Sequence, residues 1–320
     1  MQKIKQFMSL SGLTALEVIR QPICVLLATS CVILIMLLPI LISHTLGESS
    51  KIIRDSALSL GFVSGLLFGG YAACHILTHE IRRGTAASVL SSPVSREVFF
   101  LSKFTGVALV MILFESAVGV TAMMSTRMAY ETFHIDWWVG LPLILTPVFA
   151  YLVAAIINYR TRKPFASTAF VLLVVFLFIT FIVTSFLDRR GQWVEFGKLV
   201  PFELVPAIVL VTMAVLILSG LAVSLATRLD VVPTISICSL MFVAGLLSDY
   251  VFGQFADTSA LAAFFYGLLP NWQHFWMMDA LAHEGGIPWL YVAQTGVYSF
   301  FYLCGILCFG IFAFRQMDVR

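Results

Sequence analysis

Charged residues are scarce in this sequence. Its 320 residues include 19 Lys and Arg and 17 Asp and Glu, so only 11% of the chain is charged, under half the share that is usual in soluble domains. Hydrophobic residues make up 60% of the chain, and the mean hydropathy is +0.98. A soluble fold of this composition would have to bury almost all of its apolar side chains, whereas a membrane protein would not. The net charge of +2 is too small to indicate a nucleic-acid partner.

The short motifs of several enzyme classes are also absent from the sequence. There is no phosphate-binding G-x-x-x-x-G-K-[ST] loop, no zinc-binding H-E-x-x-H and no G-x-S-x-G nucleophile turn. His75 and His79, beside Glu80, have helical spacing but lack a further ligand, and Cys304 and Cys308 have no His or carboxylate nearby. We therefore expect no catalytic residue, no metal site and no enzymatic activity in this chain by itself.

Long uncharged stretches recur along the chain, and each is close to the roughly 20 residues that a helix needs to cross a bilayer. They are 21–47, 56–79, 137–159, 164–187, 204–227, 231–248 and 285–314, and 104–126 joins them except for Glu115. The pattern predicts an all-α, polytopic transmembrane helix bundle with about eight spans, six to eight being possible. Residues 1–320 then form a single membrane domain.

Two stretches near the C-terminus are less certain spans. Residues 231–248 are short, and 258–278 are interrupted by Pro270, Asn271 and His274. We interpret 254–288 as an outer re-entrant or interfacial segment whose aromatic side chains lie at headgroup depth.

The distribution of Lys and Arg predicts the orientation. With the N-terminus in the cytoplasm, the inner segments hold 13 basic residues and the outer segments hold 6. The outer ones are Lys51, Arg54, Arg127, Arg189, Arg190 and Lys198. Because cytoplasmic loops are enriched in Lys and Arg, both termini are expected in the cytoplasm and the chain in the cytoplasmic membrane.

Two inner segments have patterns of their own. Residues 1–21 alternate apolar and polar positions and predict an amphipathic helix in the membrane interface, an ordinary tail being the alternative. In the inner loop 78–103, Gly84 favours a bend and Pro93 ends a short helix, while Ser95 is placed as the N-cap of 96–103. This predicts two short helices parallel to the inner surface.

Residues of this loop resemble the permeases of ABC-2 type exporters, in the branch often labelled multicopper-enzyme maturation permeases. The similarity lies in Glu80, Gly84, Thr85, 89–96, Phe99, Lys103, Phe104 and Gly106. Glu17 and Arg20 resemble the amino-terminal elbow helix of that family, and 269–281 and the last span are similar too. Family members usually have six spans, so eight would mean a two-span insertion or two re-entrant stretches.

The resemblance implies a permease that works with a second copy or a homologue, in contact with membrane lipids, and with two cytoplasmic ATPase subunits. ATP and Mg would be bound by those subunits, and this chain would hold no cofactor. The residues that would couple it to the ATPase are Glu80, Arg82, Arg83, Gly84, Thr85, Pro93, Ser95 and Arg96. Lipid headgroup binding by the same arginines is the alternative.

Glu115 is a carboxyl in the middle of a predicted span, where an ionised group costs about 2.5–3.5 kcal/mol to insert. It is expected to face the protein interior, a substrate path or a partner permease. The favoured function is the permease subunit of an ATP-driven exporter. An ion-coupled secondary transporter, or a membrane scaffold or enzyme, remains the alternative, and the sequence does not identify the substrate.

Overall fold

A computed structural model describes residues 2–42, 49–82, 94–129, 135–255, 258–277 and 286–316. Within these ranges the regular elements are all helices, and one isolated β-bridge joins Leu187 to Trp193. The longer helices are α1 (Gln2–Arg20), α2 (Pro22–Leu41), α3 (Ser49–Arg82), α5 (Arg96–Met128), α6 (Trp137–Thr161), α7 (Phe165–Ser185), α8 (Val205–Leu225), α9 (Val231–Leu246) and α12 (Trp289–Arg315). The shorter ones are α10 (Ser248–Val251), α11 (Ala260–Leu268), η1 (Phe202–Leu204), η2 (Gly253–Phe255) and η3 (Trp272–His274).

Seven of these helices are long and apolar enough to cross a membrane: α2, α3, α5, α6, α7, α8 and α12. An eighth crossing is reached only if α9 and the segment that follows it are one span, because the chain bends by 58° after Leu246. The expected multi-pass helical bundle is therefore confirmed. The short stretch 231–248 is the one that differs, since it forms a broken helix rather than a straight span.

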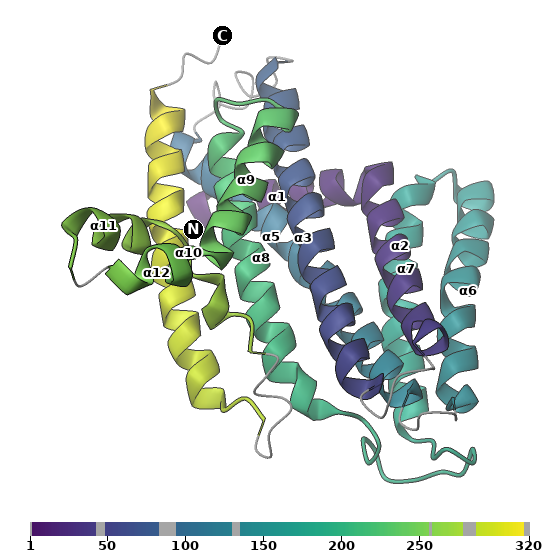
Figure 1. Ribbon diagram of the computed structural model, residues 1–320. Helices are drawn as coiled ribbons and strands as arrows, with labels where there is room; N and C mark the ends of the chain where they lie inside the picture. The colour runs from purple at the N-terminus through teal and green to yellow at the C-terminus, as the bar shows by residue number, and fades with distance from the viewer. Residues whose placement is uncertain are drawn as a thin grey trace.

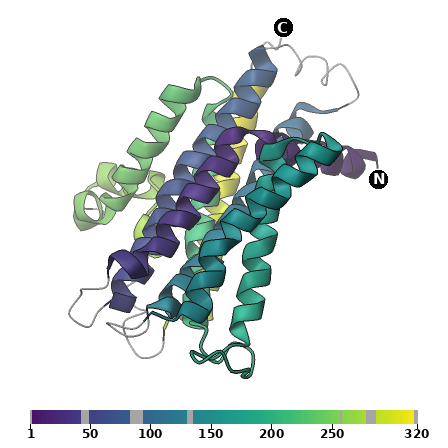
Figure 2. The same ribbon diagram turned by 90° about the vertical axis from the view of Figure 1, so that its right-hand side faces the viewer.

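The spans run alternately up and down (Figures 1 and 2). We call the upper end of the bundle in these views the α3–α5 end, because α3 ends there and α5 begins there. Helices α8 and α12 also end there. Helix α1 lies crosswise in the upper part of the bundle, nearly perpendicular to α2. Helices α6 and α7 pack on each other at one side of the bundle (Figure 1).

Burial differs strongly among the spans. In the apolar stretch of α5 that is long enough to cross a membrane, 78% of the residues are buried inside the protein, whereas in that of α12 17% are buried. Helices α3 and α8 pack against both α5 and each other, so α3, α5 and α8 form the centre of the bundle. Helix α12 packs mainly on α8 and leaves a wide apolar face uncovered.

Local sequence signals account for the helix starts. Ser95 is the N-cap of α5 and accepts a hydrogen bond from the Val98 backbone N–H at 3.4 Å, and Asp136 caps α6 through Trp138 N at 3.1 Å. Pro22 and Pro206 occupy the first turns of α2 and α8, where a missing N–H is tolerated.

The sequence was right about the cap at Ser95 but wrong about the helix that follows it. Residues 96–103 do not form a separate helix along the membrane surface. They are the first two turns of the 33-residue α5, because no proline or helix-ending glycine interrupts the chain before Met128 and because Phe99 and Phe100 are buried against the bundle. The segment between α3 and α5 is correspondingly shorter than expected.

The segment after α9 turns back beside α12. Helices α10 and α11 lie crosswise beside the middle of α12, halfway along the bundle, in both views (Figures 1 and 2). Asp249 accepts hydrogen bonds from the Tyr266 hydroxyl and the Asn271 amide, each at 2.7 Å, which fix this turn of the chain. The re-entrant or interfacial character of this segment stays a prediction.

Candidate functional site

The α3–α5 end of the bundle contains the described part of the predicted coupling residues. Glu80 and Arg82 lie in the last turn of α3, and Ser95 and Arg96 begin α5. The remaining four, Arg83, Gly84, Thr85 and Pro93, lie outside the described residues. The end of α3 and the start of α5 thus lie at the same end of the bundle.

The start of α5 is tied to the end of α12. The Arg96 guanidinium donates to the Arg315 carbonyl at 2.7 Å, and the Arg315 guanidinium pairs with the Glu97 carboxylate. Below these polar contacts, the Phe314 ring lies 5.7 Å from that of Phe99 and 6.2 Å from that of Phe100. A displacement of the chain just before α5 would therefore also move the end of α12.

Helix α1 packs across α5 next to the same end. A Cβ atom added to Gly106 of α5 would lie 2.5 Å from Thr14 Cβ and 2.7 Å from the Ser11 carbonyl oxygen, so the two backbones touch. The outward face of α1 carries exposed apolar side chains, among them Ile4 and Met8. This distribution suits a helix that lies between protein and lipid.

The two residues predicted for the elbow lie near the end of α1. Glu17 is half-buried and Arg20 is exposed. Gln21 follows at the turn into α2, and its side-chain amide makes a 2.7 Å hydrogen bond with the His75 ring on α3. The turn between α1 and α2 is thereby connected to the last part of α3.

Glu115 lies in the centre of the bundle with 1% of its surface exposed. Its carboxyl group is placed against α3, where a Cβ on Gly65 would come within 2.4 Å of Oε1 and one on Gly61 within 3.5 Å of Oε2. Oε1 has no hydrogen-bond partner among the residues that the structure describes. Two glycines one helical turn apart thus make the space that this carboxyl group fills.

The same glycine face of α3 continues toward the α3–α5 end. A Cβ on Gly69 would lie 2.4 Å from Ser219 Oγ of α8, and this buried hydroxyl also lacks a partner in the described part of the chain. Small residues at every fourth position allow close helix approach. Two buried oxygen atoms without a partner in the described residues, Glu115 Oε1 and Ser219 Oγ, therefore face one seam between α3, α5 and α8.

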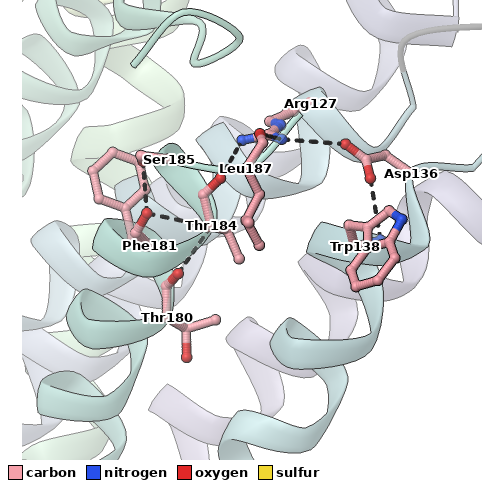
Figure 3. A network of polar contacts seen from close by, with 8 residues as sticks. All are labelled: Arg127, Asp136, Trp138, Thr180, Phe181, Thr184, Ser185 and Leu187. Carbon is pink, nitrogen blue, oxygen red and sulfur yellow. Dashed lines mark hydrogen bonds and ion pairs between the residues drawn. The ribbon is translucent and has the colours of Figure 1, made fainter. Parts of the chain in front are cut away.

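A separate cluster of buried polar side chains, the Arg127 network, lies at the C-terminal end of α5 (Figure 3). Its guanidinium donates to the carbonyl oxygens of Thr184 at 2.7 Å and Leu187 at 2.6 Å, and pairs with Asp136 at 3.4 Å. Both charged side chains are 5% exposed. Because carbonyl groups at a helix C-terminus lack intrahelical partners, Arg127 satisfies the end of α7 while Asp136 caps the start of α6.

Sequence reasoning found some of these residues and missed others. It predicted that the Glu115 carboxyl faces the protein interior, and the side chain is buried in the structure. It counted Arg127 as a loop charge, whereas the side chain is buried and joins three helices. The glycines of α3 were also missed, although their spacing of four residues at Gly61, Gly65 and Gly69 was a readable signal for close packing.

Comparison with known proteins adds no relative: no protein-family model, no curated protein and no solved structure matches this chain. The resemblance in residues 80–106 and the contacts at the α3–α5 end therefore carry the functional proposal.

Proposed function

We propose that this chain is the membrane-spanning permease subunit of an ABC-2 type exporter. It would move its substrate across the cytoplasmic membrane by means of two separate ATPase subunits, which bind ATP and Mg, together with a second copy or a homologue of itself. The α3–α5 end, with both termini, would face the cytoplasm. The coupling surface would comprise the end of α3, residues 83–93 and the start of α5.

One observation supports this proposal above the others. The start of α5 is joined to α12 by Arg96, Glu97 and Arg315, and α5 is covered by α1 through Gly106. A displacement of the segment before α5 would thus act on α1, α5 and α12 together. A loop that only connects two spans needs no such ties.

Helix α5 also offers a way to carry the motion through the membrane. Its 33 residues make an uninterrupted helix about 50 Å long at 1.5 Å per residue. It passes Glu115 in the centre and ends at Arg127, which is bonded to the ends of α6 and α7. A rigid central helix with fixed contacts at both ends can shift neighbouring helices without changing its own shape.

The proposal is tested by site-specific crosslinking in native membranes. A photo-reactive amino acid at Thr85 should capture a protein that contains the phosphate-binding motif this chain lacks, and the complex should hydrolyse ATP. The matched control is the same probe at Gln192, which is exposed in the loop at the opposite end of the bundle. That probe should capture no ATPase.

The same two positions also test orientation. With Cys304 and Cys308 replaced by alanine, a cysteine at Gln192 should react with a membrane-impermeant maleimide in intact cells, and one at Thr85 only after permeabilisation. Labelling of Thr85→Cys in intact cells, or repeated absence of a nucleotide hydrolase from the crosslinked products, would remove the exporter assignment.

A second candidate, an ion-coupled secondary transporter, is favoured by the unpaired Oε1 of Glu115 in the seam between α3, α5 and α8. Intramembrane carboxyl groups often bind protons in transporters. Purified protein in liposomes with an internal pH-sensitive dye separates the two: proton flux without an ATPase, abolished in Glu115→Gln, would support ion coupling. Equal, negligible flux in both proteins would exclude it.

A further inference from the structure

A lateral pocket of about 480 Å³ lies between α8, α11 and α12, and Trp272 of η3 and Met241 of α9 also line it. This volume falls within the ~300–1,000 Å³ of ordinary ligand sites. The wall from α8 is formed by residues in 217–225, and the wall from α12 by residues in 301–309. Both stretches belong to the parts of these helices that run toward the α3–α5 end, so the pocket lies in that half of the bundle.

The interior of the pocket is apolar. Among the described residues that line it, the polar side chains are those of Ser224, Trp272 and Tyr302. Tyr302 donates its hydroxyl hydrogen to the Leu268 carbonyl at 2.6 Å, and Trp272 donates to the Met241 carbonyl at 3.3 Å. The Ser224 hydroxyl shares its one hydrogen between the carbonyls of Gly220 and Ile306. Because these polar hydrogens are used inside the protein, an occupant of the pocket would meet mainly hydrocarbon.

The rim of the pocket continues into an uncovered apolar surface. Phe301 and Phe309 of α12 are 69% and 64% exposed, and Leu268 of α11 is 53% exposed. Two glycines, Gly267 and Gly305, line the cavity, and a Cβ added at either meets no atom within 4 Å. The missing side chains keep the pocket open, and long apolar chains could enter from the bilayer.

Cationic side chains lie just beyond the pocket, at the α3–α5 end. Exposed Arg228 follows α8 and donates to the Ala313 carbonyl at 3.0 Å, about 6 Å along α12 past Phe309 at 1.5 Å per residue. Arg315, whose side chain is 60% exposed, lies half a turn further and pairs with Glu97. An apolar cavity below an exposed guanidinium matches a molecule with a hydrocarbon tail and an anionic head.

We propose that this pocket binds an anionic phospholipid, with an acyl chain between α8, α11 and α12 and the phosphate near Arg228. The lipid belongs to the leaflet at the α3–α5 end, because the cavity and the guanidinium are on that side of the α11 segment. The site does not depend on the exporter assignment. It is a property of the isolated chain, and binding alone measures it.

Native mass spectrometry of the purified, delipidated protein tests the site. Titration with phosphatidylglycerol should give a bound lipid that phosphatidylcholine with the same chains replaces poorly. Gly305→Leu fills the cavity from α12 and Gly267→Leu fills it from α11, and each should weaken binding of that lipid at least about tenfold. The matched control is Gly12→Leu in α1, where an added Cβ also meets nothing within 4 Å and which is not among the residues that line the pocket; this variant should bind the lipid as the wild type does.

Arg228→Gln tests the head of the lipid separately from its tail. It should reduce the preference for phosphatidylglycerol over phosphatidylcholine by about fivefold, or ~1 kcal/mol, while an acyl chain still binds. Unchanged binding in both leucine variants overturns the proposal. The proposal is also overturned if the leucine variants bind the lipid normally but no longer form a dimer. That result would assign the pocket to a second copy of this chain. Equal affinity for the two lipids in the wild type overturns the assigned headgroup.

Discussion

Removing the Arg127 guanidinium should destabilise the bundle more than removing any exposed charge. In Arg127→Met, the carbonyl groups of Thr184 and Leu187 lose a charged donor, and Asp136 is left as a buried carboxylate without its partner. Breaking a buried pair in this way typically costs about 3–5 kcal/mol. Asp136→Asn should cost less, ~1–2 kcal/mol, because asparagine can still cap α6 and Arg127 keeps its two carbonyl acceptors.

The assay is equilibrium or thermal unfolding in a defined detergent, arranged as a double-mutant cycle. The doubly changed protein, Arg127→Met with Asp136→Asn, should be more stable than the sum of the single losses predicts, by about 1–3 kcal/mol, since it no longer contains an unpaired buried charge. Glu203→Gln is the control, because its pair with Arg54 leaves the glutamate 57% exposed and should contribute only ~0–1 kcal/mol. A loss below about 1 kcal/mol in Arg127→Met, or losses that add within ~0.5 kcal/mol, would show that the Arg127 network does not hold the three helices together.

Substitutions at four further positions test the packing of the bundle. Gly106→Ala should cost about 1–3 kcal/mol and loosen α1, because its Cβ meets Thr14 and the Ser11 carbonyl; faster proteolysis within residues 2–20 measures this, with Gly12→Ala unaffected. Glu115→Gln should leave the unfolding temperature unchanged or raise it, since no ion pair is lost, whereas Gly65→Ala should lower it by pressing on Oε1; the reverse order would contradict the position of the carboxyl group. Ser95→Ala should cost ~1 kcal/mol through the lost cap of α5, and Ser95→Asp should restore it, as helicity and melting can both report.

The number and position of the spans could be predicted because lipid imposes a simple condition on sequence. Runs of about 20 uncharged residues have few alternatives to a helix when no water is present to satisfy the backbone. The condition fails at 231–248, because 16 helical residues are too few for a straight crossing and Asp249 with Tyr266 and Asn271 fixes the bend that follows. Those polar partners come from a segment up to 22 residues away, so the local sequence pattern does not predict these hydrogen bonds.

The interior contacts could be predicted only in part. Burial of Glu115 followed from the cost of a carboxyl in hydrocarbon, but its partners on α3 did not, since helix pairing in membranes depends on shape and not on hydrophobic pattern. Arg127 illustrates the reverse case. From the sequence it was counted among the basic residues of the outer segments, whereas the carbonyl groups at the end of α7, some 60 residues later, make its burial favourable.

The proposed lipid site and the proposed coupling surface share α12, and this has a thermodynamic consequence. The end of α12 is tied to the start of α5 by Arg315 and Phe314, while its middle forms one wall of the pocket against α8. If the ATPase moves the start of α5, the separation of α8 and α12 changes with it, and lipid affinity must then differ between nucleotide states. Linkage requires the converse, so the same lipid must change nucleotide affinity by the same factor. A lipid affinity that is the same in all nucleotide states of the complex would show that the pocket and the coupling surface are not linked. A difference that vanishes in Gly305→Leu would place the connection in α12.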